Sequence, residues 1–167
     1  VKANKSGSSY GITKVYKIEE LKSAIETAYK EDDEIIIEGF LEGTEVSVGV
    51  LKLKGETTVF PITEIVTEND FFDYEAKYEG KSQEITPARI NKAQLEKVTA
   101  VAKKIYDVLK MTGFSRSEFI FIGDDPFLLE MNTTPGLTTA SILPQQAKAA
   151  GIELGMLFEH AIKEALS

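Results

Sequence analysis

Apolar residues recur at two spacings along the chain, and these spacings separate predicted helices from predicted strands. Helical spacing predicts helices at about residues 18–30, 91–111, 140–150 and 153–166. Alternating positions and short apolar runs predict strands at residues 11–15, 34–41, 45–51 and 57–66. Residues 67–88 keep no steady period, so we expect a long loop there.

The most informative stretch is residues 116–136, which the pattern predicts to form a β-hairpin. Two apolar runs flank the turn residues 123–126, Gly-Asp-Asp-Pro, and we expect Ile122 to pair with Pro126 across this turn. Side chains alternate between the two faces of a strand. The predicted core face therefore carries Phe119, Phe121, Phe127, Leu129 and Met131.

In that register, Glu118 lies opposite Glu130 and Arg116 lies opposite Asn132 on the second face of the hairpin. Neighbouring carboxylates repel each other, and a divalent cation would relieve this repulsion. Mg²⁺ prefers oxygen ligands and is commonly held by one or two carboxylates together with substrate phosphates. The pattern therefore predicts either a magnesium site, with the arginine facing a bound anion, or an exposed face whose charges are simply hydrated.

The composition is that of an ordinary globular chain. It has 167 residues, of which 43% are hydrophobic and 28% charged, enough for one core or two small lobes. A net charge of −8 without a basic run argues against nucleic-acid binding. The absence of cysteine excludes disulfides and thiolate metal sites, and the only histidine, His160, lies near no acid or nucleophile motif. With no apolar stretch long enough to cross a membrane and no visible signal peptide, we expect no membrane partner.

Two further segments are candidates for ligand contacts. Residues 4–11, which follow Lys2, are rich in Gly and Ser. Such loops can turn backbone N–H groups toward an anion, although most are plain turns. The loop 67–88 mixes aromatic and charged residues, so it is either an ordered surface loop or a lid that closes Lys77 and Tyr78 over a site.

Five motifs occur together in one order: Lys2 with Gly7-Ser8-Ser9, Glu38 with Glu45, Tyr74-Glu75-Ala76-Lys77-Tyr78, Arg116-Ser117-Glu118, and Glu130-Met131-Asn132-Thr133-Thr134-Pro135-Gly136-Leu137-Thr138. With them, the sequence resembles the D-alanine–D-alanine ligases, which belong to the ATP-grasp superfamily of carboxylate–amine ligases. The resemblance runs over essentially the whole chain but covers only the back part of such an enzyme. Residues 1–4 also look like the end of a strand, so we expect a fragment whose missing N-terminal part belongs to the same enzyme.

The resemblance implies ATP-dependent joining of two D-alanine molecules through an acyl phosphate, in the cytoplasm and for peptidoglycan synthesis. ATP and Mg²⁺ (or Mn²⁺) would be the cofactors, D-alanine the substrate, and a homodimer one arrangement of the enzyme. Because this family holds the first D-alanine in its upstream domain, we expect the present chain alone to be inactive. Two alternatives stay open. One is another ATP-grasp ligase, such as a D-alanyl–D-lactate ligase, against which Tyr78 argues, and the other is a non-catalytic nucleotide-binding module.

The resemblance also implies a role for each matched residue. The nucleotide would be held by Lys2 at the inner phosphates, the flap Gly7, Ser8 and Ser9, the adenine hinge Glu38, Gly39, Phe40 and Leu41, Glu45 at the ribose, and Lys77 at the outer phosphates. Mg²⁺ would be bound by Glu118, Glu130 and Asn132. Catalysis would rely on an oxyanion site formed by Arg116 and the Gly136 N–H, and on closure of Tyr78 against Ser8. The second amino acid would be held by Ser141, Ile142 and Tyr78.

The implied fold class is α+β, an ATP-grasp fold with part of the central α/β lobe and a C-terminal antiparallel sheet flanked by helices. Residues 1–43 would form the partial central lobe, with the phosphate loop and the adenine hinge. Residues 44–167 would form the C-terminal lobe, with the lid loop and the metal hairpin. Departures from the family pattern include Gly39, where the hinge often has lysine, and Glu118, which replaces the more usual aspartate without removing a ligand.

Overall fold

The structure, a computed structural model, describes residues 1–5, 10–53, 55–67 and 82–166. The chain forms two compact units, Val1–Leu41 with Thr67–Gln83 and Glu42–Val66 with Glu84–Ser167. The lobe boundary that the sequence placed after residue 43 stays a prediction. Within the described residues, no helix combines the length and apolar character needed to cross a membrane.

The first unit is built from short elements. They are β1 (Lys2–Ala3), the 3-10 helix η1 (Ile18–Glu20), α1 (Leu21–Ala28) and β2 (Ile35–Ile36). β1 and β2 pair antiparallel, with Lys2 opposite Ile36. Helix α1 buries Ala24 and Ala28. The predicted first helix is therefore present, as η1 followed directly by α1.

Residues 11–15 do not form the predicted strand. Gly11 has a φ of +70°, a left-handed conformation that interrupts an extended strand. Thr13 bonds to the start of the chain: its N–H donates to the Val1 carbonyl at 2.9 Å, and its carbonyl accepts from the Val1 amino group at 3.0 Å. One such pair does not make a ladder. The strand predicted at residues 34–41 is likewise reduced to the two residues of β2.

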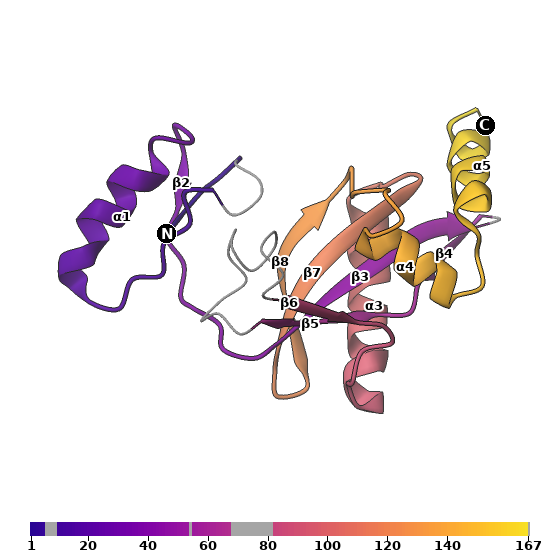
Figure 1. The fold of residues 1–167 in the computed structure, drawn as a ribbon, viewed down its shortest axis with the longest axis horizontal. Helices are drawn as coiled ribbons and strands as arrows, with labels where there is room; N and C mark the ends of the chain where they lie inside the picture. The colour runs from indigo at the N-terminus through magenta and orange to yellow at the C-terminus, as the bar shows by residue number, and fades with distance from the viewer. Residues whose placement is uncertain (6–9, 54, 68–81, 167) are drawn as a thin grey trace. The chain divides into compact units, whose positions relative to one another are not determined.

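The second unit is organised around one sheet (Figure 1). Its strands are β3 (Thr44–Leu53), β4 (Glu56–Val59), β5 (Thr63–Thr67), β6 (Ser82–Ile85), β7 (Phe114–Ile122) and β8 (Asp125–Asn132). They lie in the order β6-β5-β3-β7-β8, and β4 pairs with β3 off this path. β3 pairs antiparallel with β4, β5 and β7, and β7 pairs antiparallel with β8. The predicted C-terminal antiparallel sheet is therefore present.

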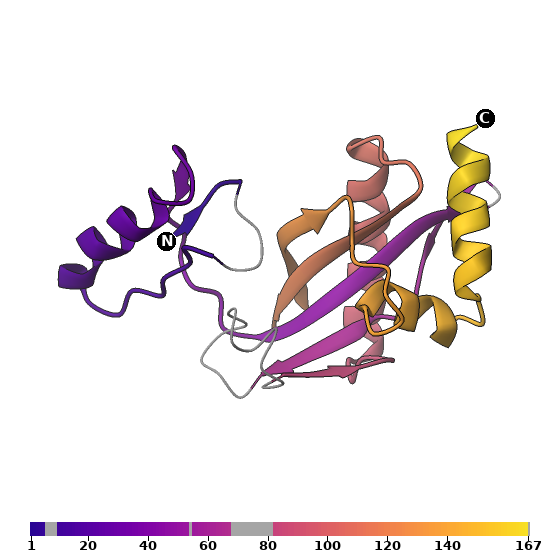
Figure 2. The same cartoon turned by 45° about the horizontal axis from the view of Figure 1, so that its top comes forward.

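Helix α3 (Lys92–Val108) covers one face of this sheet (Figure 2). The alternation in β3 is confirmed, because Val46, Val48 and Val50 are all completely buried on this side. The core cluster consists of Val46, Val48, Val50, Ile62, Val98, Ala102, Tyr106, Phe119 and Phe121. Its position means that the other face of β3 and β7 is available for different chemistry.

The ends of α3 follow local rules. Asn91 precedes the helix, and its side chain accepts from the Gln94 N–H while the Gln94 side chain accepts from the Asn91 N–H. This capping box satisfies two backbone donors at the helix start. The sequence predicted a helix to about residue 111, but the helix already ends at Val108, and Lys110 turns the chain with a left-handed φ of 52°.

Helices α4 (Ile142–Ala149) and α5 (Leu154–Ala165) cover one end of the opposite face. Gly49 on β3 allows α4 to approach, because a Cβ there would lie 2.4 Å from Gln146 Oε1 and 2.6 Å from Leu143 Cδ1. On α5, Leu157 is completely buried, whereas Phe158 and Ile162 are 39% and 59% exposed. The core cluster on this side consists of Leu51, Phe60, Leu143, Ala147 and Leu157.

The β7–β8 turn differs from the predicted turn by one residue. Ile122 pairs with Asp125 rather than with Pro126. Consequently Phe127 lies opposite Ile120, which points away from the α3 core. The assignment of Phe127 to the core face is therefore wrong, and this side chain is 45% exposed.

A β-bulge restores the predicted register further along the hairpin. Phe119 pairs with Leu128, whereas Glu118 pairs with Glu130, so Leu129 is the extra residue on β8. The shift compensates for the different turn. The predicted polar pairs are confirmed: Glu118 opposite Glu130, and Arg116 opposite Asn132.

A buried carboxylate on β5 gives a first stability prediction. Glu64 is 8% exposed, and it accepts two 2.8 Å hydrogen bonds from the Arg89 guanidinium and one of 3.1 Å from the Arg89 N–H. The guanidinium hydrogen bonds hold the pKa of Glu64 below its ordinary value of 4.5. A lowered pKa means that the folded state keeps the charge more readily than the unfolded chain does. The stabilisation is therefore present above pH 4.5 and is lost as the pH falls through the lowered pKa.

Glu64→Gln should lower the free energy of unfolding by about 1–2 kcal/mol near neutral pH. The difference from wild type should shrink as the pH falls from 4.5 through the lowered pKa of Glu64, because the carboxyl then becomes neutral in the folded state as well. Urea denaturation over a series of pH values from neutral to acidic measures both quantities. Glu159→Gln is the matched control, because Glu159 and Lys163 form an exposed pair on α5, and removing an exposed ion pair should leave the free energy of unfolding close to that of wild type. Equal losses for the two variants would contradict the role given to Glu64.

Candidate functional site

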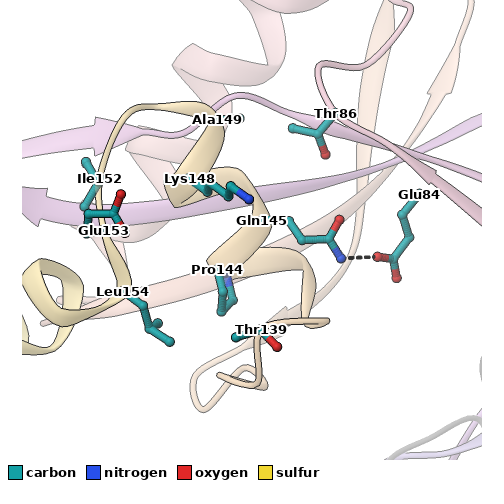
Figure 3. A pocket seen from close by; sticks show the side chains of 10 residues that line it. All are labelled: Glu84, Thr86, Thr139, Pro144, Gln145, Lys148, Ala149, Ile152, Glu153 and Leu154. Carbon is teal, nitrogen blue, oxygen red and sulfur yellow. Dashed lines mark hydrogen bonds between the residues drawn. The ribbon is translucent and has the colours of Figure 1, made fainter.

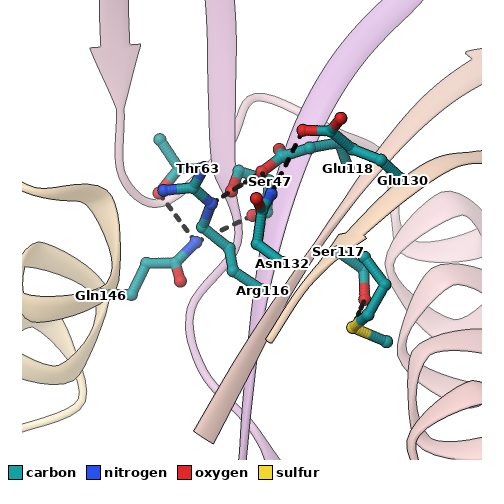
Figure 4. Close-up of polar contacts among 9 residues, drawn as sticks. Ser47, Thr63, Arg116, Ser117, Glu118, Glu130, Asn132 and Gln146 are labelled. Carbon is teal, nitrogen blue, oxygen red and sulfur yellow. Dashed lines mark hydrogen bonds and ion pairs between the residues drawn. The ribbon is translucent and has the colours of Figure 1, made fainter. Parts of the chain in front are cut away.

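Four polar side chains from β7 and β8 lie together on the face of the sheet opposite α3 (Figure 4). Arg116 Nε donates to Glu118 Oε1 at 2.6 Å. Asn132 Nδ2 lies 3.5 Å from Glu118 Oε1 and 3.2 Å from Glu130 Oε1. The structure therefore brings the predicted metal ligands and the predicted oxyanion arginine into one cluster, whereas their ligand stays a prediction.

Glu118 is the most enclosed member of this cluster. It is 7% exposed, and Ser47 on the neighbouring strand β3 donates its hydroxyl to Glu118 Oε1 at 3.3 Å. Burial raises the pKa of Glu118 above its ordinary value of 4.5, while the charge and the hydrogen bond of Arg116 act in the opposite direction. A carboxylate in this environment gains from any additional positive charge placed beside it.

The donor set fits a hard divalent cation. The Asn132 amide nitrogen is within hydrogen-bond reach of both carboxylates, so its partly positive N–H groups occupy the region where a cation would separate the two charges. Turning the amide over would present its oxygen instead, which together with two carboxylates is a typical set for Mg²⁺. Across the described residues, no three His, Cys, Asp or Glu side chains gather as a metal site.

Beyond Glu118, the same face of the sheet becomes apolar. Ile120 lies opposite Phe127 on β8 and opposite Glu45 on β3. The exposed Phe127 ring and the partly buried Ile120 beside a charged cluster provide a surface on which a flat ring can pack. Sequence reasoning missed Phe127 here because the turn and the bulge together decide which face it takes. Glu45, the predicted ribose ligand, belongs to this row.

Another group of predicted residues meets at the start of α4. Ser141 precedes the helix, and its hydroxyl pairs with the Thr138 hydroxyl at 2.9 Å rather than capping the helix. A Cβ on Gly136 would lie 2.8 Å from Ser141 Oγ, so the Gly136 backbone and this hydroxyl are neighbours. Ile142 is only 7% exposed, so its side chain is core. Its backbone N–H, in the first turn of α4, is the group that can reach a ligand.

In the first unit, the predicted nucleotide contacts are placed as follows. Lys2 Nζ pairs with Glu38 Oε1 at 2.7 Å, so an anion at Lys2 would share this ammonium group with Glu38. Phe40 is 51% exposed, and Lys14 Nζ lies 3.7 Å from its ring centroid. Around Gly39, an added Cβ would meet no atom within 4 Å, so the missing hinge lysine is not excluded by packing.

Several predicted residues fall outside the part of the chain that the structure describes. They are Gly7, Ser8, Ser9, Lys77 and Tyr78. The predicted flap and lid therefore stay predictions. The last hinge residue, Leu41, is described and is partly buried.

A hollow of about 690 Å³ lies beside α4 and the connection to α5 (Figure 3). Its lining includes Glu84, Lys148 and Glu153, and Gln145 Nε2 donates to Glu84 Oε2 across it at 3.0 Å. None of the predicted site residues that the structure describes lines this hollow. It is open and mixed in character, and we assign it no role in the chemistry.

Sequence reasoning missed two residues next to the cluster. Ser47 holds Glu118, and Gln146 on α4 donates through Nε2 to the Ser47 carbonyl at 2.8 Å and to Thr63 Oγ1 at 3.0 Å. The available signal for Ser47 was a hydroxyl among valines, on the side of the strand away from the core. For Gln146 it was a polar side chain within the buried face of a short helix.

Comparison with known proteins shows what the chain is similar to. The family model described as the D-ala D-ala ligase C-terminus matches residues 1–163. A D-alanine--D-alanine ligase of Flavobacterium johnsoniae is 67% identical over 167 residues, which are 100% of this chain and 52% of that protein. One from Christiangramia forsetii is 59% identical over 167 residues, again 100% of this chain and 51% of that protein. The chain thus spans about half the length of the curated relatives that it matches.

Solved structures share the fold. The VanG D-Ala:D-Ser ligase of Enterococcus faecalis matches with a TM-score of 0.86 at 36% identity, over 97% of this chain and 48% of that one. A D-alanine--D-alanine ligase from Bacillus anthracis, complexed with ATP, matches with a TM-score of 0.77 at 30% identity, over 91% of this chain and 48% of that one.

Proposed function

The chain belongs to the D-alanine–D-alanine ligase family, whose C-terminal part it matches, and we propose that it is the metal-binding half of an enzyme that joins two D-alanine molecules. The family resemblance is confirmed, and so is the fold class: α+β, with antiparallel sheets and helices, like the ATP-grasp ligases. Use of ATP with Mg²⁺, a cytoplasmic location, a homodimeric arrangement and a role in peptidoglycan synthesis are parts of the proposal.

One observation carries the proposal: carboxylates from two neighbouring strands converge on a single amide, with a guanidinium alongside. Glu118 and Glu130 both lie within hydrogen-bond reach of Asn132 Nδ2, and Arg116 is bonded to Glu118. A phosphate-bound Mg²⁺ needs few protein oxygens in such an arrangement. The same face also offers a donor for a developing negative charge.

The reaction explains why these groups are needed. An amine does not displace hydroxide from a carboxylate, so the first D-alanine carboxylate attacks the γ-phosphorus of ATP, giving an acyl phosphate and ADP. The amine of the second D-alanine then attacks the acyl carbon, and inorganic phosphate leaves with the electron pair of the broken C–O bond. Phosphoryl transfer of this kind depends mainly on positioning and on positive charge.

Each residue of the cluster has a defined task in this proposal. Glu118, Glu130 and Asn132 would hold Mg²⁺, which would supply positive charge against the transferring phosphoryl group. Arg116 is oriented through its Nε bond to Glu118 before a substrate arrives. Its guanidinium can then donate to the oxyanion of the tetrahedral intermediate without costly rearrangement.

The start of α4 serves the second amino acid. The Gly136 N–H is the second oxyanion donor, and the neighbouring Ser141 hydroxyl binds the incoming amino acid. The Ile142 N–H adds a donor at the positive end of the helix, where a carboxylate is favoured. The family resemblance further assigns the nucleotide to Lys2, Glu38–Leu41 and Glu45, together with the flap 7–9 and the lid residues 77–78.

The direct test uses the full-length enzyme with ATP, Mg²⁺ and D-alanine, and measures ADP and dipeptide together. We expect one ADP for each D-alanyl-D-alanine formed. The likeness to a D-Ala:D-Ser ligase makes the second substrate worth testing, so D-serine and D-lactate should compete with D-alanine in the same assay. We expect the dipeptide of D-alanine to dominate. ADP release that ignores D-alanine would contradict a ligase and support a nucleotide-binding module.

The chain by itself should form no dipeptide under these conditions. It spans about half the length of its relatives, and the proposal places the first D-alanine on the other half. Measurable ligation by the isolated chain would contradict the assignment of the first D-alanine to the other half of the enzyme.

A further inference from the structure

Gln146 is a completely buried polar residue that the proposed chemistry does not use. It lies on α4, and its exposed fraction is 0%. Its amide nitrogen donates to the Ser47 carbonyl at 2.8 Å and to Thr63 Oγ1 at 3.0 Å. Thr63 in turn pairs with Thr86 at 2.6 Å. The Gln146 side chain thus ties a helix to two strands (Figure 4), and Thr63 links this pair of hydrogen bonds to the segment after β6.

The orientation of this amide is fixed by its partner. The Ser47 carbonyl can only accept a hydrogen bond, so the nitrogen rather than the oxygen of Gln146 must face it. Gln146 Oε1 points toward Gly49, where an added Cβ would lie only 2.4 Å away. Among the described residues, this buried oxygen has no hydrogen-bond partner. Burying this oxygen without a partner costs stability, and the two hydrogen bonds that the amide nitrogen donates oppose that cost.

Gln146 connects the two halves of the proposed site within the second unit. Through Ser47 it reaches Glu118, because the Ser47 hydroxyl donates to Glu118 Oε1 at 3.3 Å. Through its own helix it reaches Ser141, which immediately precedes α4. The metal ligand and the start of α4 are therefore held to one point on β3.

We propose that Gln146 is a positioning residue that fixes Ser47, and through it Glu118, relative to the amino-acid site at the start of α4. The inference rests on the proposed ligase function. It assigns Gln146 no contact with substrate or metal. Its hydrogen bond to the Ser47 carbonyl sets the distance between the cation and the incoming amine, a distance to which such reactions are sensitive.

Gln146→Met in the full-length enzyme removes the hydrogen bonds and keeps the side-chain volume. We expect the KM for the second D-alanine and the half-saturating Mg²⁺ concentration each to rise about tenfold, while the KM for ATP changes less than about twofold. If Gln146 had a merely structural role, its loss would lower the thermal midpoint and the active fraction of the enzyme. The KM for the second D-alanine and the half-saturating Mg²⁺ concentration would then stay unchanged. Unchanged constants in a folded, active Gln146→Met enzyme would overturn the inference.

The matched control is Gln145→Met, the same substitution one position earlier on α4. Gln145 is partly exposed and donates to Glu84 and to the Ala140 carbonyl, away from the cluster. In the Gln145→Met enzyme, the KM for the second D-alanine and the half-saturating Mg²⁺ concentration should stay within about twofold of their wild-type values. Equal shifts in the two variants would mean that α4 is generally disturbed, and would also overturn the inference.

Thr63→Val keeps the test decisive if Gln146→Met does not fold. It removes one of the two acceptors of the Gln146 amide and retains the shape of the side chain. The same two constants should rise by about threefold, and no change would overturn the inference. A wild-type enzyme that makes no dipeptide would instead contradict the proposed function, so the two failures are distinguishable.

Discussion

Replacing Glu130 with glutamine is expected to slow ligation by the full-length enzyme about a thousandfold at saturating ATP. The substitution keeps the size of the side chain and removes the charge that would hold Mg²⁺ beside the phosphates. Glu130 is exposed, and it accepts a hydrogen bond from the Asn132 amide nitrogen at 3.2 Å. The fold should therefore survive, with an unchanged thermal midpoint. Steady-state ADP release across a Mg²⁺ titration measures the loss.

Asp125→Asn is the matched control for this variant. Asp125 lies on the same strand, but at the turn, where it pairs with Lys97 at 2.6 Å. Its turnover should stay within about twofold of wild type. If Glu130→Gln kept near-normal turnover and the wild-type dependence on Mg²⁺, Glu130 would not be a metal ligand.

Glu118→Gln is expected to change activity and stability in opposite directions. Ligation should fall by at least about a hundredfold, whereas the unfolding free energy without Mg²⁺ should rise. Burial raises the pKa of Glu118, so the ionised carboxylate makes the folded state less stable. The destabilisation of the folded state by the ionised carboxylate is complete above the raised pKa, and it disappears as the pH falls toward 4.5. Glutamine removes the charge and still accepts from Arg116 and Ser47.

Glu64→Gln provides the comparison, because Glu64 is also buried but has a lowered pKa. The two substitutions should move the thermal midpoint of the Mg²⁺-free protein in opposite directions. Added Mg²⁺ with ADP should raise the midpoint of wild type and leave that of Glu118→Gln nearly unchanged. A Glu118→Gln protein that is less stable than wild type in the absence of Mg²⁺, or fully active, would contradict the account.

The polar face of the hairpin was predictable because period-two alternation and turn residues are local signals. Val46 and Phe119 identify the core side, and Glu118 and Glu130 follow on the other. The sequence prediction paired these two glutamates by placing the hairpin turn one residue too far along the chain. The bulge at Leu129 compensated for that difference. Bulges depend on tertiary packing, so the sequence alone could not place Phe127.

Other features were unpredictable because they depend on distant segments. Gln146 acquires its role only when α4 packs against Gly49, and contacts between residues so far apart in sequence leave no periodic signal. Conversely, Gly11 was visible in the sequence, and its left-handed φ explains why the predicted strand at residues 11–15 is absent. A glycine at a strand start should therefore count as a warning.

The central claim is that Glu118, Glu130 and Asn132 hold one magnesium ion. A crystal structure of the full-length enzyme with ADP and Mg²⁺ tests it most directly. The account predicts one cation with an oxygen of each residue at about 2.1 Å, and the Asn132 amide turned so that its oxygen faces the metal. A cation bound elsewhere, with Asn132 Nδ2 still between the two carboxylates, would contradict it.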